Sequence, residues 1–260
     1  MTASMDIIGF IASYAFLLVV LLVMKLCHID QTKLVAIAGL RMTVQMGIMG
    51  WVLTYIIGSQ NPWLVSLCLL VMIAFAVYRD LSMNRWMNRS FMGIAGASLT
   101  FGGLLVLAFY LLAVVREPLS AGQYTIPLAG MILGNAMTGL NLGLKSLKEA
   151  LLAGQAEIEA LLDVGGEPRE ILLPFVNQAL ETAILPTVNI MVGMGIVSLP
   201  GMMGGQIIAG ISPVTAILYQ MSISMGLSAA VCLSTFAALY LGMRTLYNKD
   251  KQVEMINVKN

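Results

Sequence analysis

Four amide and two charged side chains interrupt long apolar stretches of this sequence of 260 residues. Polar side chains at membrane depth are costly and typical of a substrate or ion path. Amides together with one carboxylate would suit a partly hydrated cation. Arg41 would either snorkel to the cytoplasmic surface or pair with Glu181. The candidate path residues are Arg41, Gln45, Asn135, Glu181, Asn189 and Gln220.

Twenty methionines offer a second chemistry, because thioether sulfur is a ligand for soft metal ions. Met191 and Met194 are three residues apart and Met221 and Met225 are four apart, so each pair could share a helix face. With Glu181 these are the candidate metal ligands. Methionine also fills apolar gaps, and this alternative stays open for each of them. The three cysteines and one histidine lack the spacing of a zinc site, and we expect no catalytic residue.

The composition predicts the environment in which these side chains lie. The chain is 59% apolar and only 10% charged, whereas an average soluble domain is about 25% charged. So few charged groups cannot cover a globular surface, and lipid must surround most of the chain. The net charge of +1 indicates no nucleic-acid partner. We therefore expect an all-α, polytopic membrane protein.

About seven segments are long enough to cross a membrane, which takes roughly 20 apolar residues each. The expected spans are Ile7–Met24, Leu34–Ile57, Trp63–Tyr78, Phe91–Val115, Thr125–Leu144, Leu180–Leu199 and Pro213–Met243. The apolar turn at 199–212 could enter the membrane as a short broken helix. The whole of 1–260 is expected to form a single transmembrane domain.

The basic residues predict the orientation. If seven helices cross, one side of the membrane carries Lys25, Lys33, Arg79, Arg85, Arg89, Lys145, Lys148, Arg169, Arg244, Lys249, Lys251 and Lys259. The other side carries only Arg116. Since cytoplasmic loops are rich in Lys and Arg, the N-terminus is predicted outside and the C-terminus in the cytoplasm. The expected location is the plasma membrane, which is the inner membrane of a bacterium.

The largest cytoplasmic loop, at about 145–175, is predicted to be helical. The fifth span continues into it without a breaker, and Gly165 and Gly166 would end the helix. Pro168 stands where a new helix would begin. The result is either a compact knob that receives a push from a soluble partner or an ordinary solvated hairpin.

The loop resembles the coupling segment of ABC permeases. The resemblance lies in Glu159-Ala160-Leu161, then Gly165, then Ile171-Leu172-Leu173-Pro174. Leu161 departs from the Glu-Ala-Ala of that family, and the gap to Leu-Pro is shorter than in the importers. The resemblance implies docking onto an ATP-hydrolysing subunit through Glu159, Ala160, Asp163, Gly165, Gly166 and Pro168.

Longer segments resemble the FetB iron-export permease family, which includes plant aluminium-tolerance proteins. They are Ile126–Met137, Val197–Gly205, Ala209–Pro213 and Ala216–Gln220, and the similarity extends over nearly the whole chain. The resemblance implies a permease, not an enzyme, that exports iron or another metal. An organic solute such as a nucleotide sugar is the alternative, and an ATP-independent secondary transporter is a third possibility.

The ATPase is expected to be a separate polypeptide. The nearest match to a phosphate loop, 139–146, lacks the four residues between its glycines and the adjacent Gly-Lys pair. ATP and Mg²⁺ would therefore bind the partner, and this chain would hold no cofactor. By analogy with the family we expect two permeases and two ATPases.

A stripe of small residues, Gly130, Gly134 and Thr138, with the same spacing repeated at Gly139 and Gly143, predicts the close approach of another helix. That helix could belong to the same subunit or to a second copy.

Overall fold

The computed structural model describes residues 7–59 and 61–247. These residues are helical and contain no β-strand. The chain divides into two compact units, Met1–Ser59 and Gln60–Asn260, which are described separately. Three lysines used to predict the orientation, Lys249, Lys251 and Lys259, lie outside the described residues.

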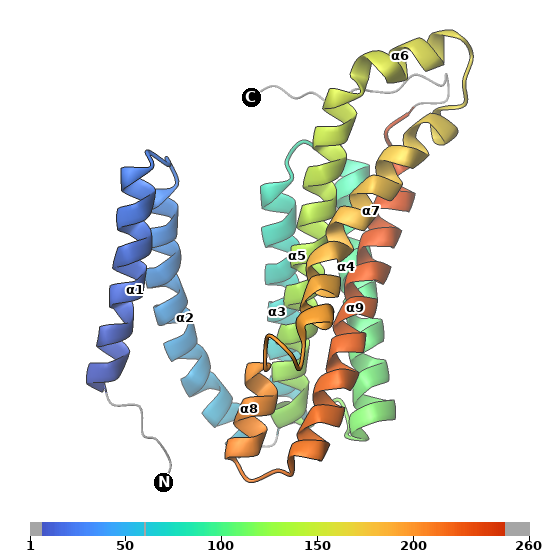
Figure 1. The fold of residues 1–260 in the computed structure, drawn as a ribbon. Helices are drawn as coiled ribbons and strands as arrows, with labels where there is room; N and C mark the ends of the chain where they lie inside the picture. Colours follow the sequence, from blue (N-terminus) through green and yellow to red (C-terminus); the bar gives the residue numbers. More distant parts are fainter. Residues whose placement is uncertain (1–6, 60, 248–260) are drawn as a thin grey trace. The chain divides into compact units, whose positions relative to one another are not determined.

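The first unit is a hairpin of α1 (Ile7–Leu26) and α2 (Thr32–Ser59), drawn in blue in Figure 1. The Tyr14 and Thr43 hydroxyls form a hydrogen bond between the two helices. Most side chains of this unit are apolar and exposed within it, as expected for helices in lipid.

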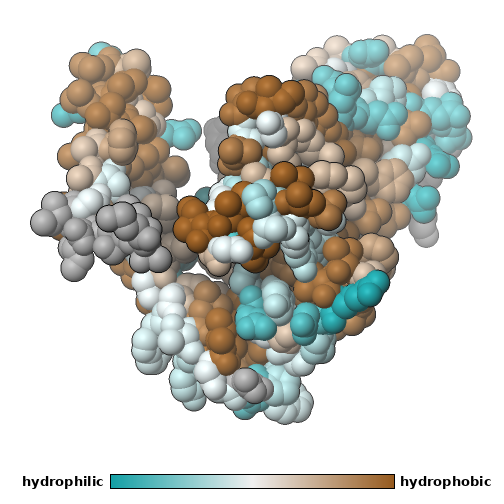
Figure 2. Space-filling model, turned by 60° about the horizontal axis from the view of Figure 1, so that its bottom comes forward, coloured by the Kyte–Doolittle hydropathy of each residue, from teal (hydrophilic) through white to brown (hydrophobic). Residues whose placement is uncertain are grey.

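The second unit holds the remaining helices. They are α3 (Pro62–Met83), α4 (Arg89–Phe109), the π-helical η1 (Tyr110–Val115), α5 (Gly122–Ala153), α6 (Gln155–Asp163), α7 (Pro168–Gly193), α8 (Gly201–Ile208) and α9 (Pro213–Met243). Figure 2 shows a face of the molecule on which apolar residues predominate.

Six helical segments among the described residues are long and apolar enough to cross a membrane: α1, α2, α3, α4 with η1, α7 and α9. The fifth expected span is α5, which is long enough at 32 residues. Its Asn135 and Asn141, together with two lysines near its end, make it less apolar. The other long helices of this unit contact α5, and counting it, the described residues hold seven long helices.

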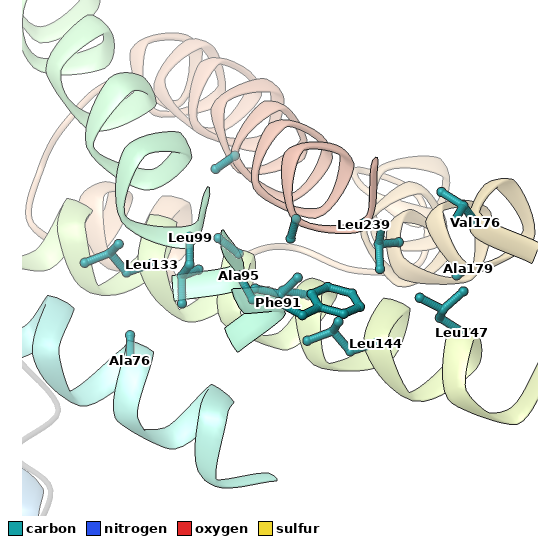
Figure 3. Packing of buried hydrophobic residues seen from close by; sticks show 14 of the residues in the cluster. Ala76, Phe91, Ala95, Leu99, Leu133, Leu144, Leu147, Val176, Ala179 and Leu239 are labelled. Carbon is teal, nitrogen blue, oxygen red and sulfur yellow. The ribbon is translucent and has the colours of Figure 1, made fainter. Parts of the chain in front are cut away.

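The core of the second unit forms around α5, which contacts α3, α4, α7 and α9. Leu140, Leu144 and Leu147 are fully buried along it, and Phe91 from α4 lies against the same cluster (Figure 3). Lipid is as apolar as these side chains, so close van der Waals packing must hold the helices together.

Of the two predicted glycine pairs, Gly139 and Gly143 pack closely and Gly130 and Gly134 do not. A Cβ on Gly143 would lie 2.9 Å from Thr235 Cγ2 of α9, and one on Gly139 would overlap Val231. A Cβ on Gly130 would make only an ordinary contact with Met72. Nothing lies within 4 Å of one on Gly134, and Thr138 is exposed. Within the described chain, the Gly130–Thr138 stripe therefore seats no helix closely.

The sixth span differs from its predicted bounds. It is α7, which begins at Pro168, not Leu180, and ends at Gly193, not Leu199. Proline at the first turn suits a helix start, so α7 begins inside the predicted loop. After Gly193 the backbone becomes extended at Met194. The short helix expected within 199–212 is α8, which extends beyond the end of α7 in Figure 1.

The basic residues of the second unit gather at the end of the bundle where α6 lies. Two hydrogen bonds fix which helix ends meet there: one joins Asn84 to Asn141, and one joins Asn88 to Thr245. The residues at or near this end are Arg79, Arg85, Arg89, Lys145, Lys148, Arg169 and Arg244. Arg116 follows η1 at the opposite end.

Candidate functional site

The connection from α5 to α7, residues 154–167, forms an elbow. Figure 1 shows α6 lying across the end of α5. The fully buried Ile158 holds α6 against the bundle. Gly165 has a φ of 86°, which glycine adopts without strain. The predicted helix, glycine turn and new helix at Pro168 are confirmed, but Gly154 separates α6 from α5, where one continuous helix was expected.

The predicted docking residues divide into exposed and structural groups. Glu159, Ala160 and Asp163 are exposed on α6, and Gln155 Nε2 donates a hydrogen bond of 2.9 Å to Glu159 Oε1. Gly165 is also exposed, whereas Gly166 is half-buried and Pro168 is buried. Two apolar side chains beside them face outward: Leu161 is 41% exposed and Val164 is 81% exposed. The elbow thus presents acidic and apolar groups together.

The predicted path residues do not form one cluster. Asn135 is half-buried on α5 and donates a hydrogen bond to the carbonyl of Met131, one turn earlier. Gln220 is buried on α9, whereas Glu181 and Asn189 are exposed on α7. The remaining predicted path residues, Arg41 and Gln45, belong to α2 in the first unit.

Two of the predicted metal ligands lie together between α7 and α9. Ser228 Oγ donates a hydrogen bond to Met191 Sδ at 2.9 Å, and Ser224 Oγ approaches Met194 Sδ at 3.5 Å. Gln220 Nε2 donates to Ser224 Oγ at 3.2 Å. We call this set the α7–α9 seam; it consists of Met191, Met194, Gln220, Ser224 and Ser228.

The other predicted ligands lie elsewhere. Met225 lines an apolar pocket of about 540 Å³ between α4 and α9, and Met221 is exposed. Glu181 is ten residues before Met191 on α7, about 15 Å along the helix axis, so the two cannot hold one ion. The described residues contain no cluster of three His, Cys, Asp or Glu side chains that could hold a metal.

Asp80 is a candidate functional residue that the sequence analysis missed. The predicted third span ends at Tyr78, but α3 continues to Met83 and buries Asp80 completely. Neither carboxylate oxygen has a hydrogen-bond partner among the described residues. Ala76, Asp80 and Asn84 recur at intervals of four, and this helical spacing was the available signal. A buried ionisable group within a membrane span is a candidate functional site.

A polar pocket of about 610 Å³ opens near Asp80, between α3 and α5. Its polar lining residues are Arg79, Asn84, Trp86, Thr138, Asn141, Lys145, Lys148 and Glu149. Lys145 forms an ion pair with Glu149 at 3.8 Å. Arg79 and Lys148 leave an excess of positive charge around the pocket.

Long apolar helices packed around a common core define a multi-pass membrane protein. The sequence profile of the Uncharacterised protein family UPF0014 matches residues 7–247. The chain belongs to this family.

Its relatives are named as permeases and membrane proteins. The chain is 32% identical to the probable iron export permease protein FetB of Escherichia coli, over 84% of this chain and 83% of that one. It is 30% identical to the UPF0014 membrane protein YjkA of Bacillus subtilis, over 96% and 100% of the two chains. It is 29% identical to the protein ALUMINUM SENSITIVE 3 of Arabidopsis thaliana, over 95% and 90%. No solved structure matches the chain.

Proposed function

We propose that the protein is the membrane-spanning permease subunit of an ABC transporter that exports iron or another metal ion. The observation that carries the proposal is the elbow between α5 and α7. It exposes Glu159, Leu161 and Asp163 on a short helix that lies across the bundle end, and Val164 directly after that helix. The relative from Escherichia coli, named as a probable iron export permease, supports the metal substrate.

The elbow would face the cytoplasm, where an ATPase could reach it. Seven basic residues of the second unit lie at this end, and Arg116 lies at the other. Cytoplasmic ends of membrane helices are enriched in such residues. The distribution supports the orientation with the N-terminus outside and the C-terminus in the cytoplasm.

A separate ATPase would supply the energy. Residues 139–146, the nearest match to a phosphate loop, belong to α5, where Gly139 and Gly143 pack against α9. Their backbone N–H groups are part of the helix and cannot surround a phosphate. ATP and Mg²⁺ would therefore bind the partner subunit, and two permeases would assemble with two ATPases.

Binding of a purified ABC-type ATPase subunit to the permease tests the proposal. Val164→Asp adds a charge to the exposed elbow, and Leu119→Asp makes the same change to an exposed apolar residue in the loop at the opposite end. We expect Val164→Asp to weaken ATPase binding at least about tenfold, the cost of losing one good apolar contact. Leu119→Asp should bind like wild type. Equal ATPase affinities for wild type and Val164→Asp would refute docking at the elbow.

An organic anion such as a nucleotide sugar is the second candidate substrate. The pocket between α3 and α5 favours it, because Arg79 and Lys148 would attract phosphate groups. ATP hydrolysis by the reconstituted complex separates the two substrates. Stimulation by Fe²⁺ supports metal export, whereas stimulation only by a nucleotide sugar, lost in Arg79→Gln/Lys148→Gln, supports the organic anion.

A further inference from the structure

The α7–α9 seam brings sulfur and oxygen donors together on two packed helices. Met191 and Met194 both turn their thioethers toward hydroxyls of α9. Gln220, at one end of the row, is 6% exposed, and its Oε1 has no hydrogen-bond partner among the described residues. An unpaired amide oxygen inside a membrane helix is unfavourable unless a ligand or another donor satisfies it.

The α9 side of the seam is a regular row. Gln220, Ser224 and Ser228 are four residues apart and therefore share one face of the helix. Cys232 continues this spacing by one more turn. The row from Gln220 to Cys232 extends about 18 Å along the helix axis, which is a large part of a hydrocarbon core about 30 Å thick.

The α7 side follows the same row in the opposite direction. Met194 contacts Ser224 and Met191 contacts Ser228, so α7 and α9 are antiparallel and in register. The same pairing of α7 with α9 continues further along both helices. Ala183 of α7 and Thr235 of α9 lie at the same level, because a Cβ on Gly143 of α5 would contact both of them. By helical spacing, Thr187 of α7 is the next polar residue of the row after Met191, one turn away. Each turn of the seam therefore offers at least one sulfur or oxygen donor.

We infer that the α7–α9 seam binds a soft monovalent metal ion, such as Cu⁺ or Ag⁺, through the thioethers of Met191 and Met194, with the Oε1 atom of Gln220 as the next donor along α9. Neutral thioethers favour soft ions over Mg²⁺, Ca²⁺ or Mn²⁺, which prefer carboxylates, carbonyls and water. The seam has no carboxylate to neutralise a divalent ion. Successive donors one turn apart would let an ion pass along α9 in short steps.

The inference deepens the proposed function and rests on it only for the use of the site in transport. It names the class of ion and the helices that carry it. It also distinguishes this methionine pair from Met221 and Met225, which lie on other faces of α9: Met225 lines the pocket shared with α4.

Silver binding to the purified full-length permease tests the site, with Ag⁺ as a probe that does not change oxidation state. The three cysteines are first replaced in Cys27→Ser/Cys68→Ser/Cys232→Ser, so that methionine is the only sulfur ligand left. Equilibrium dialysis then compares this protein with two further variants of it. Met191→Leu/Met194→Leu should weaken Ag⁺ binding at least tenfold, and the matched control Met221→Leu/Met225→Leu should leave it unchanged. Leucine keeps the side-chain volume close to that of methionine.

Ag⁺ binding as tight in Met191→Leu/Met194→Leu as in its parent would overturn the inference. X-ray absorption of the Ag⁺-loaded parent protein gives a readout that needs no variant in the seam. Sulfur neighbours are expected, and a shell of oxygen or nitrogen alone would also overturn it. If Ag⁺ binds as expected but no metal stimulates ATP hydrolysis by the complex, the export proposal fails while the binding site stands.

Discussion

Asn84 Nδ2 donates a hydrogen bond of 2.7 Å to Asn141 Oδ1 and so joins α3 to α5, although the two residues are 57 positions apart in the chain. The same amide group also donates to the carbonyl of Asp80, one turn earlier. Asn141 in turn donates to the carbonyl of Met137 in its own helix. These bonds fix the rotation of α3 relative to α5 beside a buried carboxyl group.

The Asn84–Asn141 bond should be measurable as a coupling energy. We expect the effects of Asn84→Leu and Asn141→Leu on unfolding free energy to be non-additive by about 0.6 kcal/mol, the average for interhelical hydrogen bonds in a membrane protein. Reversible unfolding of the two single variants and the double variant in mixed detergent micelles gives this value. Additive effects would mean that the two amides do not interact in the membrane.

Asp80→Asn should separate stability from transport. An unpaired buried charge is unfavourable, so its removal should leave the thermal midpoint unchanged or raise it. Transport by the reconstituted complex should fall at least about tenfold, because charged groups at membrane depth are generally retained for function. The control is Asp30→Asn, which changes an exposed carboxylate between α1 and α2. A midpoint lowered by several degrees in Asp80→Asn, with unchanged transport, would give this residue a purely structural role.

Gly143→Ala should destabilise the bundle by about 1–3 kcal/mol, as expected when a methyl group enters a well-packed core. The added Cβ would lie 2.9 Å from Thr235 Cγ2 and 3.2 Å from Ala183 Cβ. Gly134→Ala adds the same group to the same helix where nothing lies within 4 Å. Thermal unfolding in detergent should therefore show a lower midpoint for Gly143→Ala alone. An equal decrease of the thermal midpoint in both variants would instead indicate an effect of helix propensity or an unseen contact at Gly134.

Asn88→Ala should lower the unfolding free energy by about 1–2 kcal/mol, the upper range for loss of a helix cap. Asn88 Oδ1 accepts a hydrogen bond of 2.7 Å from the Phe91 amide at the start of α4, and its Nδ2 donates one of 2.7 Å to the Thr245 carbonyl after α9. Asn61 is the matched control, because its side chain caps α3 through the Trp63 amide at 3.0 Å and forms no other hydrogen bond described for it. Asn61→Ala should therefore lower the unfolding free energy by less than Asn88→Ala. A larger decrease in Asn61→Ala would show that the hydrogen bond from Asn88 to Thr245 is unimportant.

The apolar segments were sufficient to predict where most spans lie, because length and hydropathy are local properties. The seventh span begins at Pro213 and ends at Met243, as predicted. The sixth was displaced because the residues up to about 175 were assigned to the cytoplasmic loop, whereas α7 begins at Pro168 and accommodates Pro174 and Pro186. Packing against α5 and α9 stabilises that helix, and such tertiary contacts are invisible in one segment of sequence.

The two candidate sites were predictable to different degrees. The elbow depends on local signals, Gly165 at a turn and Pro168 at a helix start, and both predicted the structure correctly. Asp80 lies close to basic residues in the sequence and was assigned to a loop. Its burial depends on α3 continuing past Tyr78 and packing against α5. Similarly, spacing alone could not show that Met191 and Met194 face α9.

The length of α5 has a mechanical consequence. Its 32 residues extend about 48 Å, well beyond the hydrocarbon core. Its tightest contact with α9 lies at Gly139, where a Cβ would overlap Val231, about 21 Å from the Ala153 end and about 26 Å from the Gly122 end. If the helix tilts as a stiff rod about that contact, a small displacement applied at α6 reappears with similar size, and reversed in direction, on the far side of the membrane.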